Sequence, residues 1–177
     1  MTDLRYPIGK FSFVTPVTEE ARALGIAALA RAPSVLRAAV SGLQDPQLDT
    51  PYRPGGWTVR QVVHHLVDSH LQAYSRCKLA LTEDNPTIRP YAEAEWAKLP
   101  DSLGPIAVSL ALLDHLHARW TGLLEALPEE SFDRTCFHPE AKANLSVDRL
   151  VAMYAWHSRH HIAHITELRR RLGWHPA

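Results

Sequence analysis

Residues 156–164 read Trp-His-Ser-Arg-His-His-Ile-Ala-His and contain the most chemically informative spacing in the chain. His157 and His161 are four residues apart, so in a helix their imidazoles lie on one face, one turn from each other. Two histidines in this arrangement can bind one transition-metal ion from a single helix. The segment therefore predicts part of a metal site, and another part of the chain should supply a further ligand.

The same helical face is apolar, since it also carries Leu150, Met153, Tyr154, Leu168 and Leu172. Imidazoles on such a face are costly unless hydrogen bonds or a bound ion satisfy them. His157 and His164 are separated by about 10 Å of helical rise, too far to share one ion easily. His160 and His164 form a second pair, but His160 is rotated by about 60° onto the flank. We therefore favour His157 and His161 as ligands and expect His164 to make a structural or ligand-supporting hydrogen bond.

A second segment, residues 58–82, offers His64, His65 and His70 as further ligands. His65 lies on a polar flank of this predicted helix and could border a polar pocket between helices. His64 points away from the apolar stripe, so we expect it to be solvated. His70 lies within the stripe and is either a satisfied core histidine or a reserve ligand.

Other interpretations of these histidines have less support in the sequence. A haem attachment site would need Cys-x-x-Cys-His, which the sequence lacks. A di-iron bundle would use inward Glu residues in Glu-x-x-His motifs, whereas Asp68 and Glu167 are isolated carboxylates on their segments. The plainest alternative is that the histidines are core residues with ordinary hydrogen-bond partners.

Four predicted helices must position these residues. Apolar periodicity predicts helices over residues 19–43, 58–82, 106–127 and 146–172. Thr58 with Gln61 fits a capping box, Ser146 fits an N-cap, and Gly173 fits a left-handed C-cap. Pro33 should kink the first helix or begin a short second segment.

Long connections separate these helices. Residues 44–56, 85–101 and 128–145 predict loops, the second with at most one short turn. We find no convincing alternating strand, internal repeat or low-complexity tract. The sequence therefore predicts an all-α fold, a four-helix bundle with long crossover loops that forms one domain over residues 1–177, with ligand sites between facing helices.

The composition argues against several classes of function. The chain has 19 Lys and Arg residues and 19 Asp and Glu residues, so its formal net charge is zero. Proteins that bind nucleic acid or membrane surfaces mainly through electrostatic attraction usually carry an excess of positive charge. No apolar run reaches the roughly 18 residues of a membrane span, and the N-terminus shows no apolar signal core. With two distant cysteines, Cys77 and Cys136, we expect a cytoplasmic protein with reduced thiols. The basic cluster at residues 169–171 should complement a helix dipole.

Two stretches resemble the signatures of the DinB/YfiT-like metalloenzyme superfamily. Residues 57–66 resemble the first signature, a Trp-Thr pair followed by a His-Leu pair, and this register selects His65. Residues 157–165 resemble the second signature, whose paired histidines select His157 and His161. Residues 6–11, 52–61, 78–83 and 116–120 are similar to the YfiT branch, so that the resemblance spans nearly the whole chain.

The resemblance implies a four-helix bundle with a divalent metal ion held by His65, His157 and His161, usually as a homodimer. It also implies a metal-dependent hydrolase, or a thiol S-transferase that uses a low-molecular-weight thiol such as bacillithiol as co-substrate. Many superfamily members carry Glu where this chain has Gln61. Because Gln cannot act as a general base, activation of water by a carboxylate at this position is not expected.

A site of three histidines leaves a coordination position open for chemistry. The ion would be Zn²⁺ or Ni²⁺, with Mn²⁺ and Fe²⁺ as alternatives, because imidazole accepts all four. Bound water would serve hydrolysis of a small electrophilic substrate, whereas a bound thiolate would serve thiol transfer without a protein base. Arg76 or Arg119 could bind a carboxylate of the thiol, although a solvated surface position is the simpler interpretation. The alternative function is a non-catalytic metal-binding stress-response protein, in which His164 or His70 closes the site as a fourth ligand.

Overall fold

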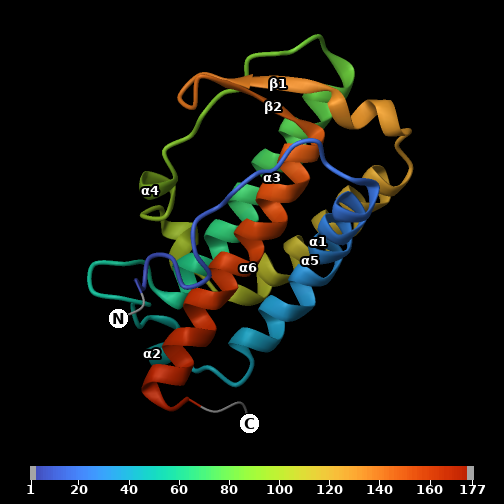
Figure 1. Ribbon diagram of the computed structural model, residues 1–177. Coiled ribbons are helices and arrows are strands. Elements are labelled where there is room, and N and C mark those ends of the chain that lie inside the picture. Colours follow the sequence, from blue (N-terminus) through green and yellow to red (C-terminus); the bar gives the residue numbers. More distant parts are fainter. Residues whose placement is uncertain (1–2, 175–177) are drawn as a thin grey trace.

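Four long helices form a bundle in the computed structural model, which describes residues 3–174 (Figure 1). These helices are α1 (Glu19–Val40), α3 (Val59–Thr82), α5 (Ile106–Glu125) and α6 (Val147–Leu172). Helix α1 packs against α5 and α6, and α3 packs against the same two helices from the other side. The predicted all-α bundle is therefore confirmed.

Short elements fill the connections between the long helices. Helix α2 (Asp45–Leu48) lies in the first connection, and α4 (Glu93–Trp96) and the 3₁₀ turn η1 (Pro100–Leu103) lie in the second. The third connection contains the 3₁₀ turn η2 (Glu129–Asp133) and an antiparallel hairpin of β1 (Thr135–His138) and β2 (Ala143–Ser146). The prediction of a loop without strands was wrong here.

The helix ends follow the local capping chemistry. Thr58 accepts a hydrogen bond from the Gln61 amide, and the Gln61 side chain accepts one from the Thr58 amide, which completes the predicted capping box. Ser146 caps α6 by accepting from the Arg149 amide. Gly173 ends α6 with a φ of 68°, a left-handed conformation that glycine adopts without strain.

Pro33 lies inside α1, which continues through it, so the predicted second helical segment does not form. The ring is buried, and the helix makes no break at this residue. Proline has no backbone N–H, so the carbonyl four residues earlier, that of Leu29, has no helical donor. This free carbonyl becomes important at the functional site.

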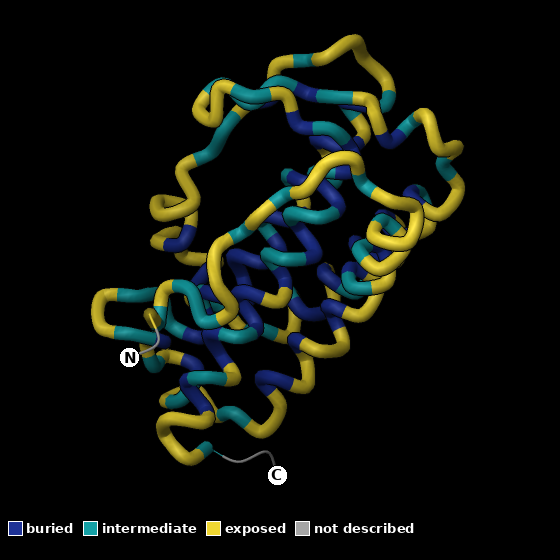
Figure 2. Tube along the Cα trace, viewed as in Figure 1, coloured by how far each residue is buried: buried dark blue, intermediate teal, exposed yellow. Residues whose placement is uncertain are grey.

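The interior contains two apolar clusters, and the buried parts of the long helices face one another inside the bundle (Figure 2). One apolar cluster is centred on Trp120 and Leu150, and the other on Leu66 and Ile165. Along α3, α5 and α6, His70, His117 and His157 lie between residues of the first cluster and residues of the second. The bundle thus holds polar groups at its centre, where they must be satisfied by one another or by a ligand.

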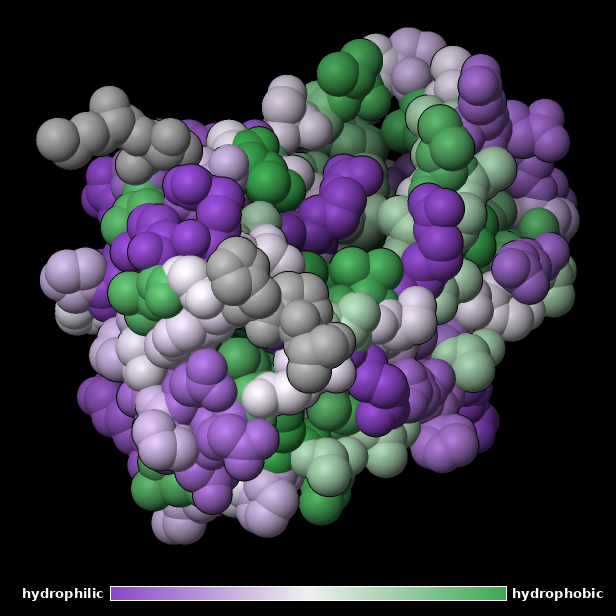
Figure 3. All heavy atoms as spheres, turned by 90° about the horizontal axis from the view of Figure 1, so that it is seen from below, coloured by the Kyte–Doolittle hydropathy of each residue, from purple (hydrophilic) through white to green (hydrophobic). Residues whose placement is uncertain are grey.

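The remaining surfaces are mixed in character. The end of the bundle opposite the hairpin presents hydrophilic and hydrophobic residues side by side (Figure 3). Within residues 3–174, α1 is the helix whose length and composition would also suit a membrane span, a test that core helices of soluble proteins pass as well. Its Leu29 and Leu36 are fully buried within the bundle.

Candidate metal centre

Helices α3 and α6 bring His65, His157 and His161 together. One potential ligand atom from each histidine lies within 4.8 Å of the other two. The Nε2 atoms of His65 and His157 are 3.3 Å apart, and the ring centroids of His157 and His161 are 4.4 Å apart. The structure therefore assembles the three histidines that the sequence predicted as ligands.

The spacing of the His65 and His157 nitrogens fits a single bound ion. With metal–nitrogen bonds of about 2.0–2.1 Å, two ligands at angles between a right angle and a tetrahedral angle lie roughly 3.0–3.4 Å apart. The 3.3 Å separation of the His65 and His157 nitrogens falls within this range. In addition, the buried Nδ1 of His161 has no hydrogen-bond partner among the described residues.

Burial keeps all three imidazoles neutral at pH 7. It lowers the pKa of His65 from 6.5 to about 4, with a smaller contribution from His164. Burial lowers the pKa of His157 and His161 well below 6.5, and neighbouring histidines add to the effect. Neutral imidazoles have a free lone pair, which is the form that binds a transition metal.

A chain of hydrogen bonds extends from His157 into the core. The Nδ1 of His157 is 3.3 Å from Nε2 of His70, and Nδ1 of His70 is 2.9 Å from Nε2 of His117. The Nδ1 of His117 is 2.6 Å from the carbonyl oxygen of Leu29. His70 and His117 are almost fully buried, so this imidazole chain is shielded from solvent.

The Leu29 carbonyl determines where each proton of the imidazole chain lies. A carbonyl can only accept, so Nδ1 of His117 is the donor, and its Nε2 accepts from Nδ1 of His70. By the same reasoning Nε2 of His70 accepts from Nδ1 of His157. The Nε2 of His157 is then left with a bare lone pair directed at the candidate metal position. Pro33 leaves this carbonyl without a helical donor, so both of its lone pairs are free to accept from His117.

The other histidines have structural partners. His164 places Nε2 3.2 Å from the Arg5 carbonyl and stacks on Tyr52, so it makes the predicted structural hydrogen bond. His160 stacks on Trp156 at a centroid distance of 4.4 Å. The prediction that His64 is solvated was wrong, because it is buried and contacts Ser109 and Gly104 through its two ring nitrogens.

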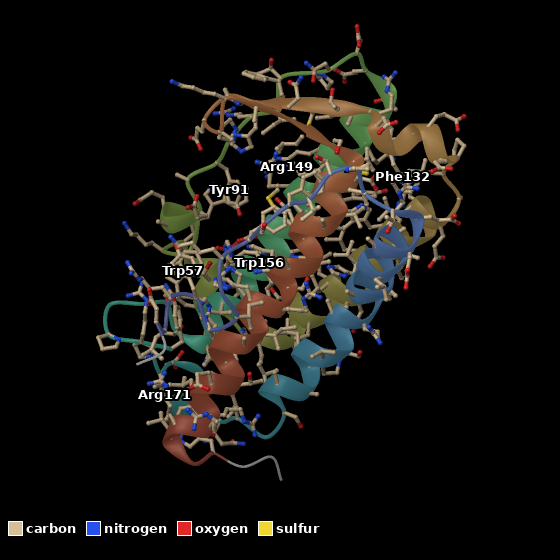
Figure 4. All side chains as sticks on the ribbon, in the orientation of Figure 1. Trp57, Tyr91, Phe132, Arg149, Trp156 and Arg171 are labelled. Atoms are coloured by element: carbon tan, nitrogen blue, oxygen red, sulfur yellow. The ribbon has the colours of Figure 1, made fainter. Side chains whose placement is uncertain are left out.

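A pocket of about 500 Å³ opens over the three histidines. Trp57 lies at one side with its ring centroid 4.5 Å from that of His65. Tyr91 and Arg149 line other parts of the pocket, so the crossover loop and α6 both contribute to its wall (Figure 4). A small molecule in this pocket would contact the candidate metal position directly.

Two further sequence interpretations are resolved by the structure. Gln61 is engaged in the capping box and donates to the Ala97 carbonyl at 2.7 Å, so its role is structural. Arg76 is buried and lines the pocket, whereas Arg119 is exposed and bonds to Tyr74. The simpler surface interpretation therefore holds for Arg119 and not for Arg76.

A helical bundle with three convergent histidines between its helices is the architecture of a metal-binding bundle protein. The sequence profile of the DinB superfamily matches residues 28–165. The chain therefore belongs to the DinB superfamily.

Similar proteins cover almost the whole chain. A protein of Bacillus cereus (strain B4264), named "putative metal-dependent hydrolase", is 55% identical over 98% of this chain and 100% of its own length. A protein of the same name from Bacillus thuringiensis subsp. konkukian (strain 97-27) is 54% identical with the same coverage. The solved structure of YfiT from Bacillus subtilis superimposes with a TM-score of 0.96 at 50% identity, covering 98% of this chain and all of that one. YfiT is described as "a probable metal-dependent hydrolase with an unusual four-helix bundle topology".

Proposed function

We propose that this chain is a divalent-metal-dependent hydrolase that acts on a small electrophilic substrate. The observation that carries the proposal is the convergence of three neutral imidazoles at one side of an open pocket. His65, His157 and His161 would hold the ion, with Zn²⁺ or Ni²⁺ favoured and Mn²⁺ or Fe²⁺ as alternatives. The hydrolase name of the relatives supports the same chemistry.

When bound, such an ion supplies Lewis acidity that lowers the pKa of a coordinated water. The residues of the chain provide the rest of the site. His70 keeps the lone pair of His157 directed into the site, and Trp57 covers one side of His65. Tyr154 and Met153 line the pocket and exclude water from part of its wall, which strengthens electrostatic interactions within it.

Thiol S-transfer is a second candidate function. The only carboxylates that line the pocket within residues 3–174 are Glu93 and Glu140, and both are exposed. Hydrolysis commonly uses a positioned general base, whereas a thiol bound as thiolate is already a nucleophile. The shortage of inward carboxylates therefore favours a bacillithiol-type co-substrate as the alternative to water.

The non-catalytic alternative, a metal-binding stress-response protein, requires a fourth protein ligand. His164 is engaged with the Arg5 carbonyl, and both nitrogens of His70 are engaged with His117 and His157. His70 therefore has no nitrogen left for a fourth ligand, which supports an open site, whereas the buried Nδ1 of His164 has no hydrogen-bond partner among the described residues.

Metal content tests the proposal most directly. Elemental analysis of tag-free protein should give about one ion per chain, and His65→Ala, His157→Ala and His161→Ala should each lose it. His64→Ala is the matched control, because His64 is a buried histidine of the same helix outside the site. Unchanged metal in all three variants, or none in the wild type after supplementation, would overturn the proposal.

Product analysis separates the two chemistries. The Zn²⁺- and Ni²⁺-loaded proteins would be incubated with ester and amide substrates in water, and with monobromobimane in the presence of bacillithiol or glutathione. Metal-dependent release of acid supports hydrolysis, and metal-dependent thioether formation supports thiol transfer. Neither product with any ion would leave the non-catalytic alternative as the function.

We also propose a cytoplasmic homodimer that binds neither nucleic acid nor membranes. Besides a second copy of the chain, its partner would be the small-molecule substrate, with a thiol co-substrate if the reaction is thiol transfer. Both cysteines are free and buried, which suits a reducing compartment. Val108 and Leu112 are exposed one turn apart on α5 and offer an apolar surface for a second copy. Light scattering after size exclusion would establish the assembly, and a monomeric mass at micromolar concentration would contradict it.

A further inference from the structure

Two arginines in the pocket, Arg76 and Arg149, have no acidic partner among the described residues. Arg76 of α3 is only 7% exposed, and its buried Nε has no hydrogen-bond partner among the described residues. Its terminal nitrogens make only long contacts of 3.4 Å, to the Tyr154 hydroxyl and the Arg89 carbonyl. Arg149 of α6 is half-buried, and its Nε is likewise buried and without a partner.

The other buried arginines of the described chain are neutralised or well bonded. Arg60 pairs with Asp49 at 2.6 Å and with Asp45 at 2.8 Å, and Arg22 pairs with Asp148 at 2.7 Å. Arg169 donates to two carbonyl oxygens at the end of α1, each at 2.8 Å. This bonding is what a charge withdrawn from water requires.

Arg76 and Arg149 depart from this pattern in the same pocket. Within residues 3–174 no carboxylate oxygen lies within 4.0 Å of either guanidinium. Glu93 and Glu140 also line the pocket, but both are exposed and remain beyond that distance. The pocket therefore combines a metal-ligand cluster with two guanidinium groups that contact no carboxylate of the described residues.

We propose that this pocket binds an oxyanion group of the substrate, a carboxylate or a phosphate, through Arg76 and Arg149. The planar guanidinium offers paired N–H donors that match both oxyanions. The reactive part of the substrate would then face His65, His157 and His161. This inference deepens the proposed function, because it assigns a substrate class to the same pocket, yet the anion site can be tested without any metal.

The test uses metal-free, tag-free protein at constant ionic strength. Nuclear magnetic resonance of arginine Nε–H groups would follow separate titrations with sodium acetate and with inorganic phosphate. We expect saturable shifts of the Arg76 and Arg149 signals with at least one of the two anions, and the tighter binder would identify the source. Arg76→Gln should weaken binding, read at Arg149, at least tenfold, whereas the control Arg119→Gln should leave it within twofold.

A second measurement separates a binding arginine from a structural one. Arg76→Met removes a charge that has no acidic partner, so it should raise the melting temperature of the ligand-free protein. Absence of saturable shifts with both anions, or a lowered melting temperature with unchanged anion binding, would overturn the inference. Metal content of the same variants, which should stay at the wild-type level, tests the proposed function separately.

Discussion

Replacing His70 by Phe tests whether the imidazole chain controls metal affinity. The ring of Phe can retain the edge contacts with Trp120 and Tyr154, but Phe is larger than His by more than a methylene group, so the melting temperature of the variant must be compared with that of the wild type. The substitution removes the acceptor for Nδ1 of His157. It also leaves His117 and its bond to the Leu29 carbonyl in place.

The expected loss follows from the proton positions. In metal-free His70→Phe, the proton of His157 can move to Nε2, where His65 lies 3.3 Å away, so little is lost. In the metal-bound state Nε2 must be bare, and Nδ1–H is left buried without an acceptor at a cost of about 1–3 kcal/mol. Since 1.4 kcal/mol corresponds to tenfold, affinity should fall roughly 5–150-fold. This agrees with the about 10–100-fold effect typical of partners that orient metal ligands.

Competition with a chromophoric chelator of known affinity would measure the dissociation constant for Zn²⁺. We expect His70→Phe to weaken binding most, His117→Phe to have a smaller effect, and the control His64→Phe to have none. Nitrogen-15 spectra of the metal-free wild type should show His157 protonated at Nδ1. An unchanged affinity in a folded His70→Phe protein, or a wild-type His157 protonated at Nε2, would refute the reasoning.

Three further predictions concern stability. Gly122→Ala should raise the free energy of unfolding by about 1 kcal/mol, because the added Cβ meets no atom within 4 Å. Gly25→Ala should lower it, because the added Cβ would lie 2.9 Å from Cγ1 of Val151. Urea titration of both variants measures the two changes. Burial raises the pKa of Asp68 to about 6, so its ionised form is unfavourable in the folded state. Asp68→Asn should therefore stabilise the protein by about 1 kcal/mol at pH 7.5, and should not do so below pH 4. Equal melting temperatures of the variant and the wild type at pH 7.5 would count against this. The metal-free wild type should lose stability as the pH falls from 7.5 to 5. The pKa values of its buried histidines are lowered below 6.5, so in that range these histidines take up protons in the unfolded chain and not in the folded one. A melting temperature that is constant or rises on acidification would contradict the neutral state assigned to these imidazoles.

The sequence predicted those features that depend on neighbours within one helix. The start of α3 follows from Thr58 and Gln61, because a capping box involves residues three apart. The helical repeat gave two possible histidine pairs, and the position of His160 on the flank of the apolar face favoured His157 with His161. His65 was selected by its polar flank and by a family signature, and the structure places it beside the other two.

Features that depend on distant contacts could not be predicted in this way. His117 received no role, because its partner is the Leu29 carbonyl, 88 residues away in sequence, which Pro33 leaves without a helical donor. His64 was expected in solvent, because a helical wheel shows one buried side, whereas Gly104 and Ser109 cover α3 from a second side. The hairpin strands have four residues each, too few for an alternating pattern to be recognised.

The imidazole chain has a consequence for the maturation of the protein. It takes one member from each long helix: Leu29 from α1, His70 from α3, His117 from α5 and His157 from α6. A chain in which α1 has not yet docked lacks the acceptor that orders the protons, so its imidazoles would present a mixture of bare and protonated nitrogens. Only the fully folded bundle would then bind the metal tightly, and metal binding would stabilise that state over partly folded ones.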